Sequence, residues 1–424
     1  MTTSDAFNTI SMIGLGYIGL PTAAMFAARR KHVIGVDVNQ RAVDTINQGR
    51  IHIVEPELDI IVRGVVSEGF LRATTRPEPA DAFLIAVPTP FKAEHEPDVA
   101  YVRAAAESIA PVLKRGDLVV LESTSPVGTT EQLVGWLAAS RPDLRFPVPG
   151  HADIDVNVAY CPERVLPGHV VRELVQNDRI IGGLTARCSE RAVALYRTFV
   201  QGELLITNAR TAEMCKLTEN SFRDVNIAFA NELSVICDKL DINVWDLIRL
   251  ANRHPRVNIL QPGTGVGGHC IAVDPWFIVH KSPDEARLIR SARQVNDAKP
   301  EWVLERVLAA VAERQTALGR SEAALRVALL GLAFKPNIDD LRESPALHVA
   351  AALARRTAAR ISFVEPNVTE LPRSLEAGRL VALDVALADA DIVVVLVSHR
   401  EFAGLPGRLT PAQVLIDAVG VTAS

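Results

Sequence analysis

The fold is decided by the stretch Gly14-Leu15-Gly16-Tyr17-Ile18-Gly19. An apolar run at 9–13, typical of a strand, precedes it, and a helical stretch at 21–29 follows it. In a strand–turn–helix unit, glycines at this spacing allow a tight turn, close approach of the backbone to a pyrophosphate and close helix–strand packing. The amides around Tyr17 and Ile18 would then face an anion at the helix N-terminus. We therefore predict a dinucleotide-binding turn formed by Gly14, Gly16 and Gly19.

An acidic residue farther along the chain supports this interpretation. Asp37 lies directly after a second apolar run, 33–36. A carboxylate at that place accepts a hydrogen bond from a ribose 2′-hydroxyl and repels a 2′-phosphate, so the expected cofactor is NAD rather than NADP. The alternative interpretation is a glycine-rich turn beside a solvated aspartate.

Further apolar runs extend the pattern along the chain. Runs at 82–86, 118–121, 156–159 and 179–181 are typical of a parallel α/β sheet. One long helix is expected from about 207 to 240, and a second α/β unit from about 325, with strands at 327–330, 361–364, 391–398 and 414–417. The predicted fold is α/β, with two Rossmann-like doubly wound domains joined by a long central helix. The expected domains are 1–205, a central helical and dimerisation region at 206–300, and 315–424.

Composition excludes several classes of function. The 424 residues are 48% hydrophobic and 22% charged, with a net charge of −5, so the chain as a whole has no attraction for nucleic acid or an anionic membrane. The first residues lack the basic region of a signal peptide, and the apolar runs are too short to span a bilayer. No cluster of histidine and acidic residues has metal-ligand spacing. We expect a cytoplasmic protein without a metal, a nucleic-acid partner or a membrane partner.

The expected long helix carries an apolar stripe. Its members recur every three or four residues: Phe222, Val225, Phe229, Leu233, Ile236 and Leu240. Packing against a second copy would explain the stripe, and so would packing within one chain. A homodimer is the expected assembly.

Three threonines follow apolar runs in the first half of the chain. Thr89, Thr124 and Thr130 would lie beyond the carboxyl ends of strands, where ligands bind in open α/β sheets. Their hydroxyls could line the cofactor. The alternative is that they only cap turns set by the neighbouring prolines.

One of the five cysteines has a distinctive setting. Cys270 ends the run Gly263-Thr264-Gly265-Val266-Gly267-Gly268-His269, and Asp274 follows four residues later. A glycine-rich loop lets the backbone approach a ligand closely. Two interpretations follow: Cys270 is a nucleophile, or it is an inert thiol in an ordinary loop.

A polar stripe on the long helix favours the nucleophile. Lys216, Asn220, Arg223 and Asn231 share one helical face. A thiolate can add to an aldehyde, and loss of hydride from the resulting thiohemiacetal gives a thioester. A nearby lysine lowers the thiol pKa and stabilises the developing oxyanion. The alternative interpretation is that these polar side chains only form a solvated face of the helix.

Taken together, several motifs resemble the UDP-glucose/GDP-mannose dehydrogenase family along essentially the whole chain. They are 14–19, 123–128, Cys161-Pro162-Glu163-Arg164, 216–220, 267–270 and 334–345. The resemblance implies two successive hydride transfers from C6 of a nucleotide sugar to two NAD molecules, with 315–424 as the UDP-sugar-binding domain. The stretches 211–231 and 249–262 imply a UDP-N-acetylhexosamine, UDP-N-acetyl-D-mannosamine, as the substrate, and a uronate product for surface polysaccharides such as enterobacterial common antigen.

The resemblance also implies residue roles. Cys270 would be the nucleophile, with Lys216, Asn220 and Asp274 as the other catalytic residues. Arg342 would reach the cofactor. The residues implied to hold the UDP-sugar are Arg164, Val165, Lys216, Asn220, Arg223, His254, Arg256, Gly267, Phe334 and Lys335.

One departure from the family pattern bears on the substrate. Pro167 stands where the glucose branch has a second glutamate, so the role of that acid cannot be transferred, and an N-acetylhexosamine is favoured over glucose. Three alternatives stay open. They are another UDP-sugar 6-dehydrogenase, a two-electron 3-hydroxyacid dehydrogenase, which would need no cysteine, and a non-catalytic nucleotide-sugar sensor.

Overall fold

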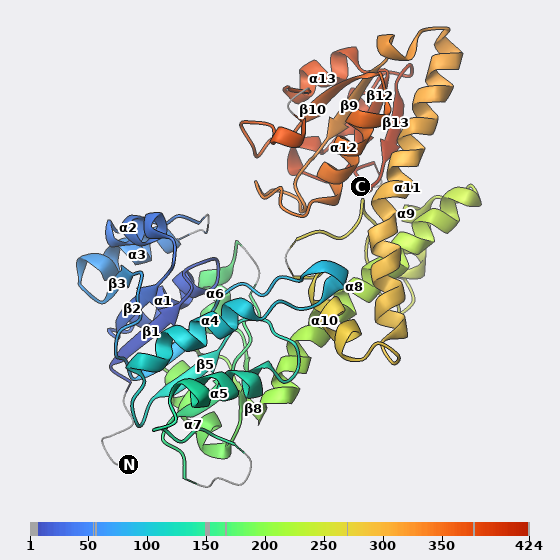
Figure 1. The fold of residues 1–424 in the computed structure, drawn as a ribbon. Helices are drawn as coiled ribbons and strands as arrows, with labels where there is room; N and C mark the ends of the chain where they lie inside the picture. The colour runs from blue at the N-terminus through green and yellow to red at the C-terminus, as the bar shows by residue number, and fades with distance from the viewer. Residues whose placement is uncertain are drawn as a thin grey trace. The chain divides into compact units, whose positions relative to one another are not determined.

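The computed structural model describes residues 7–53, 55, 57–148, 153–165, 168–268, 270–375 and 378–422. The chain divides into two compact units, Met1–Glu219 and Asn220–Ser424. Each unit is built on a β-sheet of its own (Figure 1). Within the described ranges, no helix combines the length and the apolar character needed to cross a membrane.

The first unit contains an eight-stranded sheet in the order β3-β2-β1-β4-β5-β6-β7-β8. The strands are β1 (Thr9–Ile13), β2 (His32–Val36), β3 (Leu71–Thr74), β4 (Ala82–Ile85), β5 (Leu118–Leu121), β6 (Asn157–Tyr160), β7 (Arg179–Gly183) and β8 (Leu204–Asn208). The order changes direction between β1 and β4, and nucleotides bind at this switch point in open α/β sheets.

Helices pack on both faces of this sheet (Figure 1). They are α1 (Gly19–Ala28), α2 (Gln40–Asn47), α3 (Leu58–Ser67), α4 (Ala100–Ile109), α5 (Thr129–Ser140), α6 (Val170–Gln176) and α7 (Ala186–Tyr196). Leu84 packs in the cluster with α1 and α7, whereas its neighbour Phe83 packs in the cluster with α4 and α5. A strand buried on both faces needs apolar residues at every position, which explains the continuous apolar runs.

Two long helices follow the first sheet. Helix α8 (Ala209–Lys239) has 31 residues without glycine or proline, so nothing in its sequence interrupts it. After α9 (Val244–Ala251) and α10 (Asp274–Lys281) comes α11 (Arg287–Leu318), a second long helix that the sequence did not predict. Pro300 lies inside α11, and a proline normally ends a helical pattern, which concealed the length of this helix.

The second unit contains a five-stranded, fully parallel sheet in the order β11-β10-β9-β12-β13. Its elements are β9 (Arg326–Leu330), α12 (Pro345–Arg356), β10 (Arg360–Val364), β11 (Arg379–Leu380), α13 (Leu383–Asp389), β12 (Ile392–Val395) and β13 (Val414–Asp417). Helix α11 packs with α12 on one face and α13 covers the other (Figure 1). Numbered from β9, the strand order repeats that of the first five strands of the other sheet, which confirms two Rossmann-like domains.

The sequence-based prediction was wrong about the direction or bounds of some strands and missed others. Strand β7 is antiparallel to β6, where a wholly parallel sheet was expected, because an apolar run does not encode strand direction. Strands β3, β8 and β11 were missed, because edge strands are partly exposed and lack a continuous apolar run. The strand expected at 391–398 extends only over Ile392–Val395, and the long helix begins at Ala209, since residues up to Asn208 belong to β8.

Candidate active site

The glycine turn between β1 and α1 has the geometry of a nucleotide-binding loop. Gly14 has φ +93°, and a β-carbon there would lie 2.4 Å from the Ala86 carbonyl oxygen. A β-carbon on Gly19 would lie 1.8 Å from the Gly14 carbonyl oxygen, so α1 can begin this close only with glycine. Beside Gly16, by contrast, no heavy atom lies within 4 Å of that position. Tyr17, 38% exposed, is next to this open side. The residues present therefore fit a bound dinucleotide.

Asp37 lies at the end of β2, beside the same turn. Its carboxylate accepts hydrogen bonds from the Leu15 amide (2.9 Å) and the Asn39 amide (2.8 Å). An ionised carboxylate has about four acceptor positions, so two remain for ribose hydroxyls. The backbone thus fixes the Asp37 carboxylate beside the glycine turn, and its contact with a ribose stays a prediction.

The predicted threonines have different surroundings. The Thr89 hydroxyl donates to the Thr124 carbonyl oxygen (2.6 Å), which joins the loops after β4 and β5. Thr130 is fully buried, and both its amide (2.8 Å) and its hydroxyl (2.6 Å) donate to Glu213. Thr89 and Thr124 lie beyond the carboxyl ends of their strands as expected, and the Thr89 and Thr130 hydroxyls both donate to internal acceptors. A cofactor contact by any of the three stays a prediction.

Arg164 and Val165 follow β6. The Arg164 guanidinium pairs with Glu219 of α8 at 2.7 Å, and its amide donates to Glu163 (2.8 Å). Val165 packs against the core of the first unit. A diphosphate would have to compete with Glu219 for Arg164. Pro167, on which the departure from the glucose branch depends, lies outside the described residues.

A buried polar cluster beneath this loop escaped the sequence analysis. Arg179, only 3% exposed, pairs with Glu163 at 2.7 Å. Tyr196 donates its hydroxyl to Glu122, whose other carboxylate oxygen is buried and has no hydrogen-bond partner among the described residues. Burial raises the pKa of Glu122 to about 7, although the Arg179 guanidinium offsets part of that rise. The motif Cys161–Arg164 pointed to this region, but the sequence held no sign of the partners on β7 and α7.

Only one of the five cysteines is exposed. Cys270 is exposed, Cys215 is half-buried, and Cys161, Cys188 and Cys237 are buried. Burial also raises the pKa of Cys161 to about 12, which keeps that thiol protonated. Cys270 therefore has the most accessible thiol of the five cysteines.

The loop before Cys270 packs against the segment after β9. A β-carbon on Gly267 would lie 2.3 Å from the Glu343 carbonyl oxygen and 3.1 Å from the Phe334 β-carbon. Gly268 has φ +84°, and its β-carbon would lie 2.9 Å from the Phe334 ring. Glycine is required here because backbone and aromatic ring are in direct contact. The structure thus brings together two predicted substrate-binding residues, Gly267 and Phe334.

Asn220 and Asp274 are also brought together. Asp274 begins α10, is 3% exposed, and accepts a hydrogen bond from the Asn220 side-chain amide. The Cys270 carbonyl oxygen accepts from the Asp274 amide (2.8 Å), so the cysteine lies in the turn that leads into this helix. On α8, Lys216 is half-buried in the first unit and Arg223 is exposed in the second.

The remaining predicted cationic residues belong to the second unit, and all of them except Lys335 are exposed. His254 and Arg256 are both exposed, and the His254 ring accepts a hydrogen bond from the Arg256 amide (3.3 Å). Lys335 is half-buried, whereas Arg342 is exposed and pairs with Asp340 at 2.7 Å. Nothing in these positions tests the contacts predicted for them.

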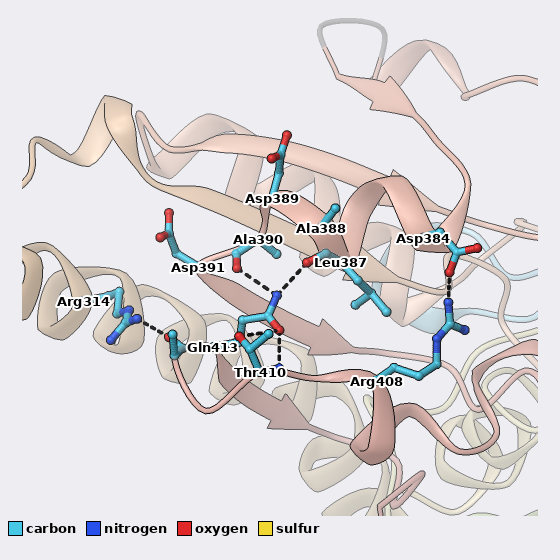
Figure 2. A pocket seen from close by; sticks show the side chains of 11 residues that line it. Arg314, Asp384, Leu387, Ala388, Asp389, Ala390, Asp391, Arg408, Thr410 and Gln413 are labelled. Atoms are coloured by element: carbon cyan, nitrogen blue, oxygen red, sulfur yellow. Dashed lines mark hydrogen bonds and ion pairs between the residues drawn. The ribbon is translucent and has the colours of Figure 1, made fainter.

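A pocket of about 440 Å³ in the second unit lies elsewhere (Figure 2). Its lining includes 389–391, just before β12, and Thr410, Ala412 and Gln413, just before β13. Those are the amino ends of the strands, whereas ligands bind at carboxyl ends. Figure 2 shows the Gln413 side-chain amide nitrogen donating to the carbonyl oxygens of Leu387 (2.6 Å) and Ala390 (3.0 Å). We do not assign this pocket to the active site.

Three regions of the chain match one protein family, the UDP-glucose/GDP-mannose dehydrogenase family. Residues 8–200 match its NAD binding domain, 210–298 its central domain, and 328–424 its UDP binding domain.

Relatives and solved structures are similar over almost their whole length. A UDP-N-acetyl-D-mannosamine dehydrogenase of Salmonella typhi is 64% identical over 417 residues, which cover 98% of this chain and 99% of that protein. An NDP-N-acetyl-D-galactosaminuronic acid dehydrogenase of Ralstonia nicotianae is 62% identical, covering 98% of this chain and 96% of that protein. The structure of UDP-D-ManNAc dehydrogenase from Pyrococcus horikoshii is similar with a TM-score of 0.87 and 37% identity, covering 97% and 96%.

Proposed function

The chain belongs to the UDP-glucose/GDP-mannose dehydrogenase family and is an NAD-dependent nucleotide-sugar dehydrogenase, and from this premise we propose that it oxidises UDP-N-acetyl-D-mannosamine at C6 to the uronate. The 64% identical relative from Salmonella typhi carries that activity in its name. A product of this kind would serve the synthesis of a surface polysaccharide of the enterobacterial common antigen type.

The proposed reaction removes four electrons. Bound NAD would supply the hydride acceptor for each of two oxidations. Per substrate, one primary alcohol, two NAD⁺ and one water give one carboxylate, two NADH and three protons. The chain must therefore hold the aldehyde formed in the first oxidation and convert it into a species that can lose a second hydride.

The exposed thiol of Cys270 is the observation that carries this proposal. Its thiolate would add to the aldehyde carbon, forming a carbon–sulfur bond and placing the electron pair on the carbonyl oxygen. Loss of hydride then leaves a thioester. Water adds to the thioester, the carbon–sulfur bond breaks, and the thiolate is restored as the acid leaves.

Three further residues, Lys216, Asn220 and Asp274, would handle protons and charge. We assign Lys216 to proton transfer with the C6 oxygen and to stabilisation of the oxyanion. Asp274 orients the Asn220 amide through their hydrogen bond, which supports a role for this pair in placing the attacking water. Because Asp274 is nearly fully buried, its carboxylate is shielded from bulk solvent at the start of α10.

Binding of the nucleotide is assigned to cationic and glycine positions. Overall the chain is acidic, so a diphosphate needs local donors. The residues proposed to contact the UDP-sugar are Arg164, Val165, Lys216, Asn220, Arg223, His254, Arg256, Gly267, Phe334 and Lys335. The packing of Phe334 on Gly268 supports this placement for the segment after β9. Arg342 is proposed to reach the cofactor.

The Cys270→Ser variant tests the covalent mechanism. Wild-type protein should form two NADH per UDP-N-acetyl-D-mannosamine, and mass spectrometry should show the uronate. The serine variant should form no uronate, because a hydroxyl is a far weaker nucleophile than a thiolate near neutral pH. Cys215→Ser, which changes a half-buried thiol, is the matched control and should keep wild-type stoichiometry. Full uronate formation by Cys270→Ser would refute the covalent mechanism.

A substrate panel tests the sugar. The 62% identical relative from Ralstonia nicotianae is named for an N-acetyl-D-galactosaminuronic acid, so the panel compares UDP-N-acetyl-D-mannosamine, UDP-N-acetyl-D-galactosamine and UDP-glucose. We expect the highest kcat/KM for the first. A higher value for either of the others would replace our substrate with that sugar, and one NADH per substrate would indicate a two-electron dehydrogenase.

We also propose a homodimer that uses the apolar stripe of α8. Phe222 (70%), Phe229 (52%) and Ile236 (44%) are exposed at seven-residue intervals, followed by Leu240 (60%). Large apolar side chains in a continuous exposed row are typical of an interface. Light scattering should give twice the mass of the 45.9 kDa chain, and Phe222→Glu with Phe229→Glu should give monomers. A monomeric wild-type protein would contradict this assembly.

A further inference from the structure

The turn after β9 repeats the construction of the cofactor turn, but with its acid used differently. Gly331 has φ +89°, and its amide donates to the Val364 carbonyl oxygen (2.8 Å), as the Gly14 amide does to Val36 (2.8 Å). The acid that follows β10 is Glu365, and the Leu332 amide donates to it at 2.7 Å. A Rossmann acid in this place commonly binds a ribose.

The Glu365 carboxylate has no free capacity for a ribose. It accepts from the Leu332 and Ala333 amides, from the amide and side chain of Asn367, and from the His399 ring (3.0 Å). These five donors exceed the roughly four acceptor positions of a carboxylate. Burial alone would raise the pKa of Glu365, but the hydrogen bonds from His399 and the backbone lower it below its usual value. Glu365 is therefore an ionised internal anchor.

His399 joins this anchor to the next part of the same segment. Its side chain and that of Glu365 are fully buried. The ring nitrogen Nδ1 accepts from the Asn337 amide (2.9 Å), so Nδ1 carries no proton and Nε2 donates to Glu365. Asn337 has φ +62°, a left-handed conformation that is uncommon outside glycine and that asparagine adopts more readily than most other residues.

The two residues thus hold both ends of segment 332–337. Glu365 binds the amides at its start and His399 binds the amide at its end. The segment presents Phe334, whose ring is in contact with Gly268, two residues before Cys270.

We propose that His399 and Glu365 are positioning residues that hold segment 332–337 in the conformation that binds the UDP group of the substrate. The inference rests on the proposed function, because that function makes the segment a substrate contact. His399 itself does not touch the substrate; it acts through the Asn337 amide. Nδ1 of His399 also lies 3.1 Å from the Asn367 side-chain nitrogen. Asn and Gln substitutions separate the hydrogen bonds of the two ring nitrogens, since an Asn oxygen can replace Nδ1 and a Gln nitrogen can replace Nε2.

The experiment measures UDP binding by calorimetry and NADH binding by fluorescence for the full-length wild type, His399→Asn and His399→Gln. We expect His399→Asn, which keeps the acceptor for Asn337, to bind UDP within about threefold of wild type. His399→Gln should bind UDP about tenfold more weakly, the scale of losing one part-buried backbone hydrogen bond. Both should bind NADH as wild type does, because the cofactor turn lies in the other unit.

Three results would overturn the inference. Unchanged UDP affinity in His399→Gln would show that the Asn337 bond does not position the site. Equal losses of UDP affinity in both variants, or losses of NADH affinity as well, would show a merely structural role. If the wild-type protein binds NADH but no UDP, the proposed UDP site itself is wrong, and the inference fails with it.

Discussion

Replacing Glu122 with glutamine should remove a pH dependence from the stability of the first unit. Glu122 is buried directly after β5 and accepts a hydrogen bond from Tyr196, and its second carboxylate oxygen has no partner in the part of the chain that the structure describes. Burial raises its pKa from 4.5 to about 7, and Arg179 offsets part of the rise. Glutamine keeps the shape and the acceptor for Tyr196 but cannot ionise.

The direction and size of the effect follow from that pKa. Between about pH 4.5 and 7 the folded protein keeps a proton that the unfolded chain releases, so the free energy of unfolding falls as the pH rises through this window. A tenfold change in an ionisation constant is about 1.4 kcal/mol, so the shift from 4.5 to about 7 lowers the free energy of unfolding by about 3 kcal/mol once Glu122 is fully ionised. Between pH 5 and pH 8 about 2 kcal/mol of it should be measurable. The glutamine variant lacks this cost.

Urea unfolding at pH 5 and pH 8 provides the assay. Trp136 lies on α5, so its fluorescence reports on the first unit once Trp245, Trp276 and Trp302 are replaced by phenylalanine. The difference in unfolding free energy between Glu122→Gln and wild type should be about 2 kcal/mol more favourable to the variant at pH 8 than at pH 5. Any effect of the substitution on packing is the same at both pH values and cancels from this comparison. Glu131→Gln, which removes a carboxylate 42% exposed on α5, is the control and should differ little between them. The same stability difference for Glu122→Gln at both pH values would refute the reasoning.

Three further substitutions have defined outcomes. Asp37→Ala should raise the KM for NAD about tenfold without raising that for NADP, because it removes the ribose acceptor, and initial rates with an unchanged NAD:NADP preference would contradict the assignment. Gly331→Ala should destabilise the second unit by about 2 kcal/mol or more in thermal unfolding, because the residue has φ +89° and the new β-carbon would lie 2.5 Å from the Val397 β-carbon. Gly407→Ala is the control and should have little effect, because there is open space where its β-carbon would lie. Arg293→Met should cost about 3–5 kcal/mol in urea unfolding, because it leaves the buried Asp224 without its ion-pair partner, and a loss under 1 kcal/mol would show that the pair is not needed.

Much of the fold could be predicted because its signals are local. Strands β1 and β13 have the predicted bounds. Of the three predicted turn glycines, Gly14 and Gly19 stand where the structure leaves no room for a β-carbon. What the prediction missed depends on position within a sheet or on context. Edge strands such as β3 show no continuous apolar run, and α11 continues through Pro300 because its neighbours support it.

The candidate site divides in the same way. The setting of Cys270 among glycines was visible in the sequence, and the structure adds that this thiol alone is exposed. The anchors of the site were not visible. Glu122 and Tyr196 are 74 residues apart, and His399 and Glu365 are 34 apart.

By itself, the amino-acid sequence determined the two α/β domains, the cofactor turn and the candidate nucleophile, because glycine spacing and apolar periodicity act within a few neighbouring residues. Only the tertiary structure decided which buried charges have partners, that Asp37 keeps acceptor positions for a ligand while Glu365 keeps none, and which faces of α8 stay exposed. Those properties depend on side chains that folding brings together from distant parts of the chain, and no local pattern encodes such a meeting.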